Sequence, residues 1–191
     1  MISPAGRQTL LQVAADSVRH GLAHGRPLAV CAADYQEELR APRATFVTLH
    51  HHGELRGCIG MLEAVRPLVE DVARNGYAAA FEDPRFAPLT AWELDGLDLH
   101  ISVLSPPECM TCTSEADLLQ QLRPGIDGLI LHDCNCRGTF LPSVWESLSE
   151  PCDFVRHLKR KAGLPPDWWS DTLTVERYTT ESFGGYLETI P

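Results

Sequence analysis

The stretch FVTLHHHGELRGCIGM constrains the fold most, because it has the pattern of a β-strand on both sides of a single turn. Residues 44–50 are rich in β-branched and aromatic side chains, and residues 54–59 follow after a turn at Gly53. The pattern predicts a β-hairpin. Gly57 and Gly60 interrupt its second strand, and glycines inside a strand commonly mark a bulge or a close approach of another backbone or a ligand.

The second strand of this hairpin carries a cation and a thiol two residues apart. Because side chains alternate along a strand, we expect Arg56 and Cys58 on one face and Leu55 and Ile59 on the other. A guanidinium beside a thiol favours the thiolate, the form that attacks carbon, exchanges disulfides and binds metal. Free cysteine is also among the most buried residue types. Cys58 is therefore either a reactive thiol or an inert, packed one.

Composition and charge exclude several classes of protein. The chain has 191 residues, of which 44% are hydrophobic and 22% charged, as in ordinary globular proteins. Its formal charge of -10 repels phosphate backbones and anionic membranes, so we expect neither nucleic acid nor a membrane as a partner. The start, MISPAGRQTL, lacks a signal-peptide pattern, and the seven cysteines, an odd number, fit reduced thiols. These features predict a cytoplasmic protein.

Helix and strand patterns are interleaved without a strict β-α-β rhythm, which favours an α+β fold over a doubly wound one. Apolar residues recur at helical spacing over residues 4–24, 67–81, 114–122 and 152–162. Further strands are predicted over residues 97–104, 128–132 and 173–178. Gly25 and Gly163 follow two of the predicted helices, where glycine commonly ends a helix.

A loop with two prolines follows the second predicted helix. This loop, EDPRFAPLT at residues 82–90, carries two carboxylates, one arginine and one aromatic ring. Rigid loops of this kind often present functional groups. Arg85 is suited to recognise a planar carboxylate or phosphate, and Asp83 could take a proton. The structural alternative is that Asp83 and Arg85 only pair with each other to hold the loop.

Several segments, in order over residues 46–169, resemble the AMMECR domain family: FVTLHHHGELRGCIGM, AAAFEDPRFAPLTAWEL, LDLHISVLSPPE, DGLILH, GTFLPSVW and KAGLPPDWW. LRGCIG is the signature of that family. The resemblance implies an α+β fold, one domain over residues 1–191 built from two intimately packed subdomains, with a mixed or antiparallel sheet and helices on its faces. It implies no settled reaction, and we predict no cofactor. Bacterial and archaeal members are often described within the AmmeMemoRadiSam system, which implies a Memo-like protein and a radical SAM enzyme as partners.

The resemblance also implies a patch for a ligand or a partner. The positions that match the family's motifs are Arg56, Gly57, Cys58 and Gly60, then Asp83, Arg85 and Phe86, and finally Leu141 and Pro142. Of these we predict as catalytic Cys58, Arg56 and Asp83. We predict as ligand-binding Gly57, Gly60, Arg85, Phe86 and Pro142.

Two functional classes follow from these residues. In the first, the protein is an enzyme or enzyme component whose cleft at Cys58 and Arg56 takes a small anionic or carbonyl-bearing molecule. In the second, the LRGCIG patch is a noncatalytic docking surface for a protein partner, and Cys58 is packed. Exposure and reactivity of the thiol discriminate between them.

Four further cysteines raise the alternative of a metal site. Cys109-x-x-Cys112 and Cys134-x-Cys136 follow the strands predicted at residues 97–104 and 128–132. If these strands are parallel, both pairs lie at one end and four thiolates could converge on zinc or an iron–sulfur cluster. If they are antiparallel, the pairs lie at opposite ends. The second pair lacks zinc-ribbon spacing, so we predict no metal site and keep these four cysteines as the alternative.

The chain has one dense basic cluster, formed by Arg156, His157, Lys159, Arg160 and Lys161. Such a cluster could touch phosphate. Its place in the last turns of a predicted helix offers a simpler reason, because cations there interact favourably with the helix dipole.

Overall fold

The chain folds into two compact units. The structure is a computed structural model and describes residues 1–190. The first unit contains Met1–Leu104 and the C-terminal segment from Glu181, and the second unit contains Ser105–Thr180. Within residues 1–190, no helix is both long enough and apolar enough to cross a membrane.

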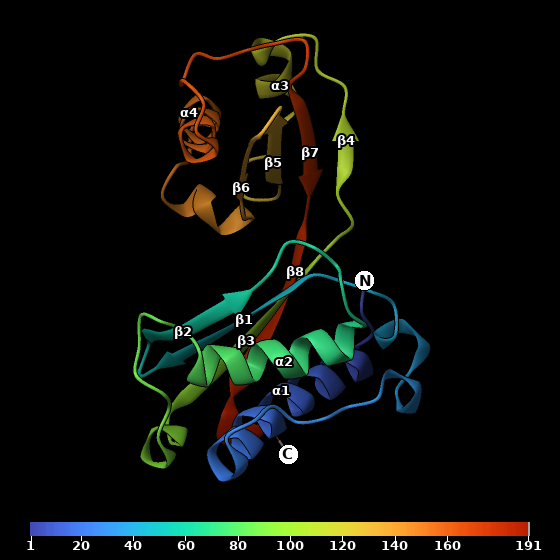
Figure 1. The fold of residues 1–191 in the computed structure, drawn as a ribbon, viewed down its shortest axis with the longest axis vertical. Coiled ribbons are helices and arrows are strands. Elements are labelled where there is room, and N and C mark those ends of the chain that lie inside the picture. The colour runs from blue at the N-terminus through green and yellow to red at the C-terminus, as the bar shows by residue number, and fades with distance from the viewer. Residues whose placement is uncertain (191) are drawn as a thin grey trace. The chain divides into compact units, whose positions relative to one another are not determined.

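The first unit is a four-stranded sheet with two long helices (Figure 1). The strands are β1 (Thr45–His51), β2 (Glu54–Gly60), β3 (Leu97–Leu104) and β8 (Thr180–Tyr186), in the order β2-β1-β3-β8. β1 pairs antiparallel with both β2 and β3. The helices are α1 (Pro4–His24) and α2 (Leu68–Phe81), which pack against each other.

Local signals set the limits of these helices. The Ser3 side chain accepts a hydrogen bond from the Gly6 amide at 3.0 Å and caps α1 at its start. Gly25, with φ of 67°, ends α1 in the left-handed conformation that glycine adopts without strain. In α2, small residues allow close packing, because a Cβ atom added at Gly76 would lie 3.2 Å from the carbonyl oxygen of Ala14.

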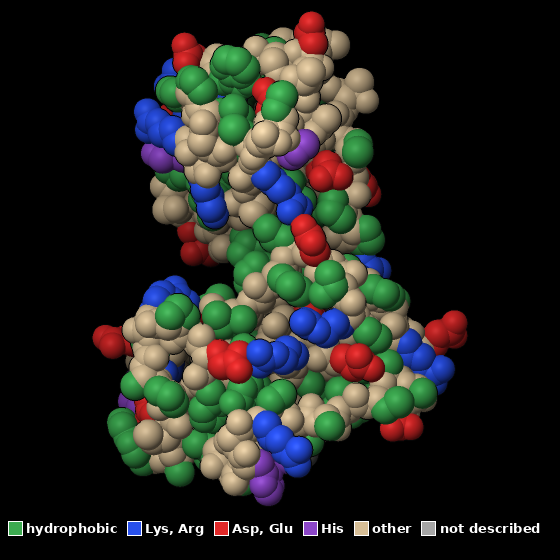
Figure 2. All heavy atoms as spheres, in the orientation of Figure 1, with side chains coloured by type: hydrophobic (Ala, Val, Ile, Leu, Met, Phe, Trp, Pro, Cys, Tyr) green, Lys and Arg blue, Asp and Glu red, His purple; other side chains and the backbone are tan. Residues whose placement is uncertain are grey.

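One face of this sheet packs against the two helices and forms part of the main hydrophobic core. Val47 and Leu49 of β1 and Leu99 and Ile101 of β3 are fully buried in one cluster with the apolar stripes of α1 and α2. Thr48, between Val47 and Leu49, points to the opposite face because side chains alternate along a strand. On the side of this unit shown in Figure 2, basic side chains lie beside acidic ones.

The second unit is a smaller antiparallel sheet with two helices. Its strands are β4 (Glu108–Met110), β5 (Gly128–Asp133), β6 (Cys136–Phe140) and β7 (Thr174–Tyr178), in the order β4-β7-β5-β6. Every neighbouring pair in this sheet is antiparallel. The helices are α3 (Glu115–Gln121) and α4 (Pro151–Ala162). Trp145 stacks on Phe154 with ring centroids 3.8 Å apart at the centre of the core.

The α+β class and every predicted helix are confirmed, with end points that agree to within one or two residues. The strands β4, β6 and β8 are not predicted from the sequence, because they are short or polar and their residue pattern gives little local signal.

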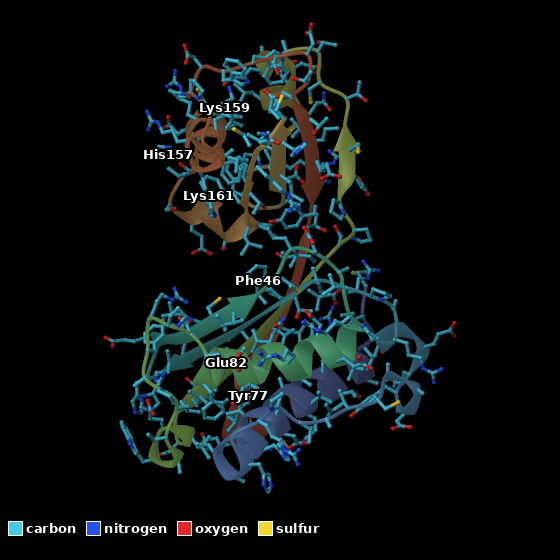
Figure 3. The ribbon with its side chains drawn as sticks, viewed as in Figure 1. Phe46, Tyr77, Glu82, His157, Lys159 and Lys161 are labelled. Atoms are coloured by element: carbon cyan, nitrogen blue, oxygen red, sulfur yellow. The ribbon has the colours of Figure 1, made fainter. Side chains whose placement is uncertain are left out.

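The basic cluster on α4 does not act as a single surface. Lys159 is fully buried, whereas His157 and Lys161 of the same helix are exposed (Figure 3). The Lys159 ammonium donates hydrogen bonds to Glu115 Oε2 at 2.9 Å and to the carbonyl oxygen of Pro166 at 3.4 Å. It is therefore a structural cation of the second unit.

Candidate functional site

The predicted site begins at an irregularity in the hairpin. Leu49 pairs with Gly57 while His50 pairs with Leu55, so Arg56 is the extra residue of a β-bulge. The bulge breaks the expected alternation: Leu55 is exposed, whereas Ile59 packs against the core. The prediction that Leu55 and Ile59 share a face is therefore wrong.

Both strand glycines lie where another backbone comes close. A Cβ atom added at Gly57 would lie 2.0 Å from the carbonyl oxygen of Ala79 on α2. One added at Gly60 would lie 2.2 Å from the carbonyl oxygen of Thr45. The close approach that the sequence pattern indicated is thus an approach of the protein's own backbone to both glycines.

Arg56 is held by the loop that follows α2. Its Nε donates to Glu93 Oε1 at 2.6 Å, and its Nη2 donates to the carbonyl oxygen of Ala87 at 2.9 Å. Glu93 lies on the short helix η3 (Ala91–Leu94) and also accepts hydrogen bonds from the Thr90 backbone and hydroxyl. The hydrogen bond from Arg56 lowers the pKa of Glu93 to about 2, so this ion pair persists well into acid.

Sequence reasoning missed Glu93, although a local signal for it exists. Thr90 and Glu93 have the spacing of a capping box, and the structure shows both of its hydrogen bonds. That signal predicts the start of a helical turn. Only the tertiary structure shows that the same carboxylate pairs with Arg56.

Asp83 is the central anchor of the site. Its buried carboxylate accepts hydrogen bonds from the Cys58 amide at 2.9 Å and from the Arg85 amide at 3.1 Å. The Arg85 guanidinium donates to both oxygens, at 3.0 Å and 2.7 Å. These donors, led by the Arg85 side chain, hold the pKa of Asp83 well below its usual range. The ion pair between Asp83 and Arg85 on which the structural alternative depends is therefore present.

Arg85 is the cation beside the Cys58 residue. Its Nη2 lies 3.3 Å from the carbonyl oxygen of Cys58, and its side chain is 53% exposed. Asp83 raises the pKa of Arg85, and Cys58 adds a smaller effect in the same direction. Phe86 lies near both guanidiniums, with its ring centroid 5.8 Å from Arg56 and 5.4 Å from Arg85.

The Cys58 thiol lies on the open face of the sheet and is partly exposed. Cys58 pairs with Thr48, and the Thr48 hydroxyl donates to Sγ at 3.2 Å. On the other side of Thr48 in the register is His100, whose Nε2 lies 2.9 Å from Asp98 Oδ2. Sequence reasoning did not select Thr48, because its link to Cys58 depends on the strand register.

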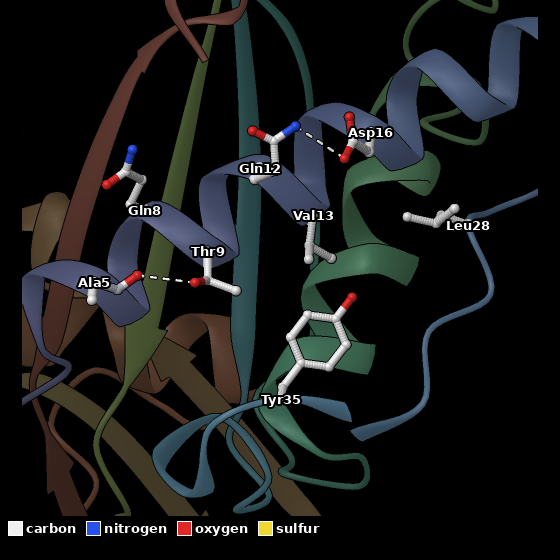
Figure 4. Close-up of a pocket in the computed structure, with 8 residues that line it drawn as sticks. All are labelled: Ala5, Gln8, Thr9, Gln12, Val13, Asp16, Leu28 and Tyr35. Carbon is white, nitrogen blue, oxygen red and sulfur yellow. Dashed lines mark hydrogen bonds between the residues drawn. The ribbon is translucent and has the colours of Figure 1, made fainter. Parts of the chain in front are cut away.

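The remaining predicted ligand-binding residue is Pro142. Pro142 is buried at the start of a short helix, Pro142–Glu146, in the second unit, whereas the arrangement around Cys58 is built from the first. A pocket of about 480 Å³ along α1 contains none of the predicted site residues; its polar lining includes Gln12, Asp16 and Tyr35 (Figure 4).

The premise of the four-cysteine alternative is wrong. The strand before Cys109 is β3 of the first sheet, and the strand before Cys134 is β5 of the second, so they do not pair at all. Cys109 itself lies within β4 and not in a loop. Within residues 1–190, no group of three or more His, Cys, Asp or Glu side chains is placed to hold a metal ion.

Replacing Asp83 with asparagine is expected to lower the free energy of unfolding by about 1–3 kcal/mol at pH 7, because the amide cannot accept all four hydrogen bonds. The folded pKa of Asp83 lies below that of an unfolded aspartate, about 3.9. The contribution of this carboxylate to the free energy of unfolding is thus fully present above the unfolded pKa and is lost as the pH falls below it. Urea denaturation from pH 7 to pH 3 should show the difference from wild type narrowing in acid. Replacing the exposed Asp95 with asparagine is the control, and a pH-independent difference would contradict the prediction.

Fold and site together define a two-unit α+β protein in which a hairpin cysteine is anchored to a charged loop. The chain belongs to the AMMECR1 family, whose family model matches residues 11–183. This match covers both units and confirms the family to which the sequence motifs pointed.

Archaeal proteins are similar to the chain over most of its length. A protein of Methanothermobacter thermautotrophicus is 38% identical over 180 residues, covering 92% of each chain. A protein of Methanocaldococcus jannaschii is 36% identical over 157 residues, covering 78% of this chain and 76% of the relative. The crystal structure of an uncharacterized protein of Pyrococcus horikoshii superposes with a TM-score of 0.83 at 31% identity, covering 96% of this chain and 93% of the other.

Proposed function

We propose that this protein is an enzyme or enzyme component that binds a small anionic or carbonyl-bearing molecule at Cys58. The observation that carries the proposal is the double use of Asp83 Oδ2, which accepts from the Cys58 amide at 2.9 Å and from Arg85 Nη2 at 2.7 Å. One buried oxygen therefore sets the backbone of the thiol residue and an exposed guanidinium in a defined geometry. A cation held beside a nucleophile is suited to bind and polarise a carbonyl-bearing anion.

The residues take distinct roles in this proposal. Arg85 binds the anion, since its Nη1 makes no hydrogen bond within residues 1–190. The Cys58 sulfur adds to the ligand's carbonyl carbon; the C=O π bond opens, and the thiol proton passes to the former carbonyl oxygen, which gives a hemithioacetal-type adduct. Thr48 donates a hydrogen bond to the sulfur and orients it. Asp83 acts as a positioning residue, because a carboxylate with a lowered pKa and four donors is a weak proton acceptor. Arg56 and Glu93 hold the loop in place.

We also carry over, as part of the proposal, the partners and location that the family resemblance and composition imply. A Memo-like protein and a radical SAM enzyme would supply or consume the ligand. A cytoplasmic location fits seven cysteines that are all free in the structure.

Alkylation of the folded protein with iodoacetamide, followed by peptide mass spectrometry, tests the proposal. Cys58 is expected to react faster than the exposed Cys31 of the same unit at pH 7, because the Arg85 guanidinium is held beside it. Replacing Arg85 with glutamine should slow this reaction, because it removes the neighbouring cation. Once a substrate is known, Cys58→Ser should abolish turnover and preserve the fold.

Two results would count against the reactive thiol. The first is labelling of Cys58 only after unfolding, and the second is a labelling rate no higher than that of Cys31. Replacing the exposed Arg40, which is outside the site, with glutamine is the matched control and should leave the Cys58 rate unchanged.

A docking surface is the second candidate, and the exposed rings and guanidiniums favour it. The exposed Arg85 guanidinium lies 5.4 Å from the centroid of the Phe86 ring, and Trp92 on η3 is 73% exposed. Arginine and aromatic side chains are the residues that most often dominate protein interfaces. A silent Cys58 in the alkylation experiment would favour this candidate, with the Memo-like protein as the first partner to test.

A further inference from the structure

A second polar pocket lies in the second unit, and its lining includes no residue used in the proposed function. Its volume is about 270 Å³, and its lining includes Arg123, Arg177, Thr179 and Glu108. This volume is below the range of about 300–1,000 Å³ typical of sites for drug-sized ligands. The pocket therefore fits a small polar group better than a whole cofactor.

Arg177 brings unused hydrogen-bond donors to this pocket. It lies on β7 directly opposite Glu108 of β4, and its Nε is 3.7 Å from Glu108 Oε2, too far for a hydrogen bond. Within residues 1–190, its guanidinium makes no hydrogen bond. Because a guanidinium carries five N–H donors in a planar fork, Arg177 has the capacity to bind an oxyanion through two of them.

Arg123 brings a second cation that is fixed in place. Its Nε and Nη2 donate to the buried carboxylate of Asp127, at 3.0 Å and 2.5 Å. These bonds leave Nη1 without a partner among the described residues. The Thr179 hydroxyl, also in the lining, makes no hydrogen bond in the described part of the chain. The pocket thus combines two guanidiniums and a hydroxyl with unsatisfied donors.

Glu108 is the acidic side chain in the lining, and it is poorly held. Its side chain is 74% exposed and makes only the long contact to Arg177. Its negative charge also reaches Arg123, whose pKa it helps to raise after the larger effect of Asp127. The Glu108 carboxylate is thus near both arginines without a hydrogen bond to either.

We propose that this pocket binds a small oxyanion, a phosphate or carboxylate group, between Arg123 and Arg177. The Glu108 carboxylate competes weakly with the ligand for the two guanidiniums. When the ligand binds, it displaces this carboxylate toward solvent. Recognition rests on charge-assisted, planar hydrogen bonds from the two guanidiniums, with Thr179 as a further donor.

Titration of the isotope-labelled full chain with inorganic phosphate, and separately with acetate, tests this site by amide chemical shifts. Sodium chloride keeps the ionic strength constant. We expect saturable amide shifts at Ser105 and Glu108, at Arg123, and at residues 177–179. Saturation by phosphate alone assigns a phosphoryl ligand, and saturation by acetate as well assigns a general carboxylate or phosphate site.

Two substitutions should change the affinity in opposite directions. Arg177→Gln is expected to weaken phosphate binding about tenfold or more, because it removes the forked cation. Glu108→Gln is expected to strengthen phosphate binding about two- to fivefold, because it removes the competing charge. The Glu108 side chain is exposed, so this substitution should leave the fold unchanged. Arg156→Gln, at an exposed position of α4, is the control and should leave the affinity unchanged. Shifts that sodium chloride reproduces, or a Glu108→Gln variant that binds phosphate more weakly, would overturn the proposal.

Discussion

Replacing Gly57 with alanine is expected to destabilise the first unit by about 3 kcal/mol or more. The added Cβ atom would lie 2.0 Å from the carbonyl oxygen of Ala79 and 3.0 Å from its carbonyl carbon. Both are backbone atoms of α2, so no rotation of a side chain can relieve the overlap. Either β2 or α2 must shift, and overpacking of this kind is costly even where side chains can adjust.

The consequence would extend to the candidate site. A shift of β2 at Gly57 moves the Cys58 amide away from Asp83 Oδ2, to which it is bonded at 2.9 Å. Urea denaturation measures the loss of stability, and Cys58 alkylation reports the change at the thiol. Gly185→Ala is the matched control, because a Cβ atom there would have only one neighbour, Thr189 Oγ1 at 3.9 Å. Equal stability of the two variants would contradict the expected contact between β2 and α2.

Replacing Glu115 with alanine is expected to destabilise the second unit by about 3–5 kcal/mol. The change leaves the fully buried Lys159 ammonium without a carboxylate partner, with the Pro166 carbonyl oxygen at 3.4 Å and the Trp169 ring centroid at 5.9 Å as its remaining contacts. Removing one partner of a buried ion pair leaves a charge without compensation, and this is costly because the ammonium has lost its hydration. Hydrogen exchange of amides in α4 and β5 measures the effect in this unit.

A double variant distinguishes the cost of an unpaired buried charge from the cost of a lost contact. The double variant Glu115→Leu with Lys159→Met removes both charges and should recover most of the stability, since apolar side chains can replace a buried pair at little cost. Glu146→Ala, at an exposed position in the same unit, should have almost no effect. A Glu115→Ala variant as stable as wild type would show that Lys159 does not need this carboxylate.

Some features of the candidate site could be predicted from local sequence, and others could not. The hairpin, the irregularity at its glycines and the pairing of Asp83 with Arg85 all involve residues a few positions apart, where spacing and turn chemistry carry the information. Arg56 was expected to be the cation that activates Cys58. Its ion pair instead joins it to Glu93, 37 residues away, and Arg85 is the guanidinium in contact with the Cys58 carbonyl.

The sequence by itself determined the α+β class, the positions of the four helices and the hairpin that carries Cys58, because helical and strand periodicities are local properties of the chain. Only the tertiary structure decided that β3 and β5 belong to different sheets, so the two strands that precede the cysteine pairs are not neighbours. It also decided that Lys159 is buried and that one oxygen of Asp83 joins Cys58 to Arg85. These features depend on strand pairing and packing between segments that are far apart in the sequence. The free energy of such contacts depends on both segments together, so the spacing of neighbouring residues does not reveal it.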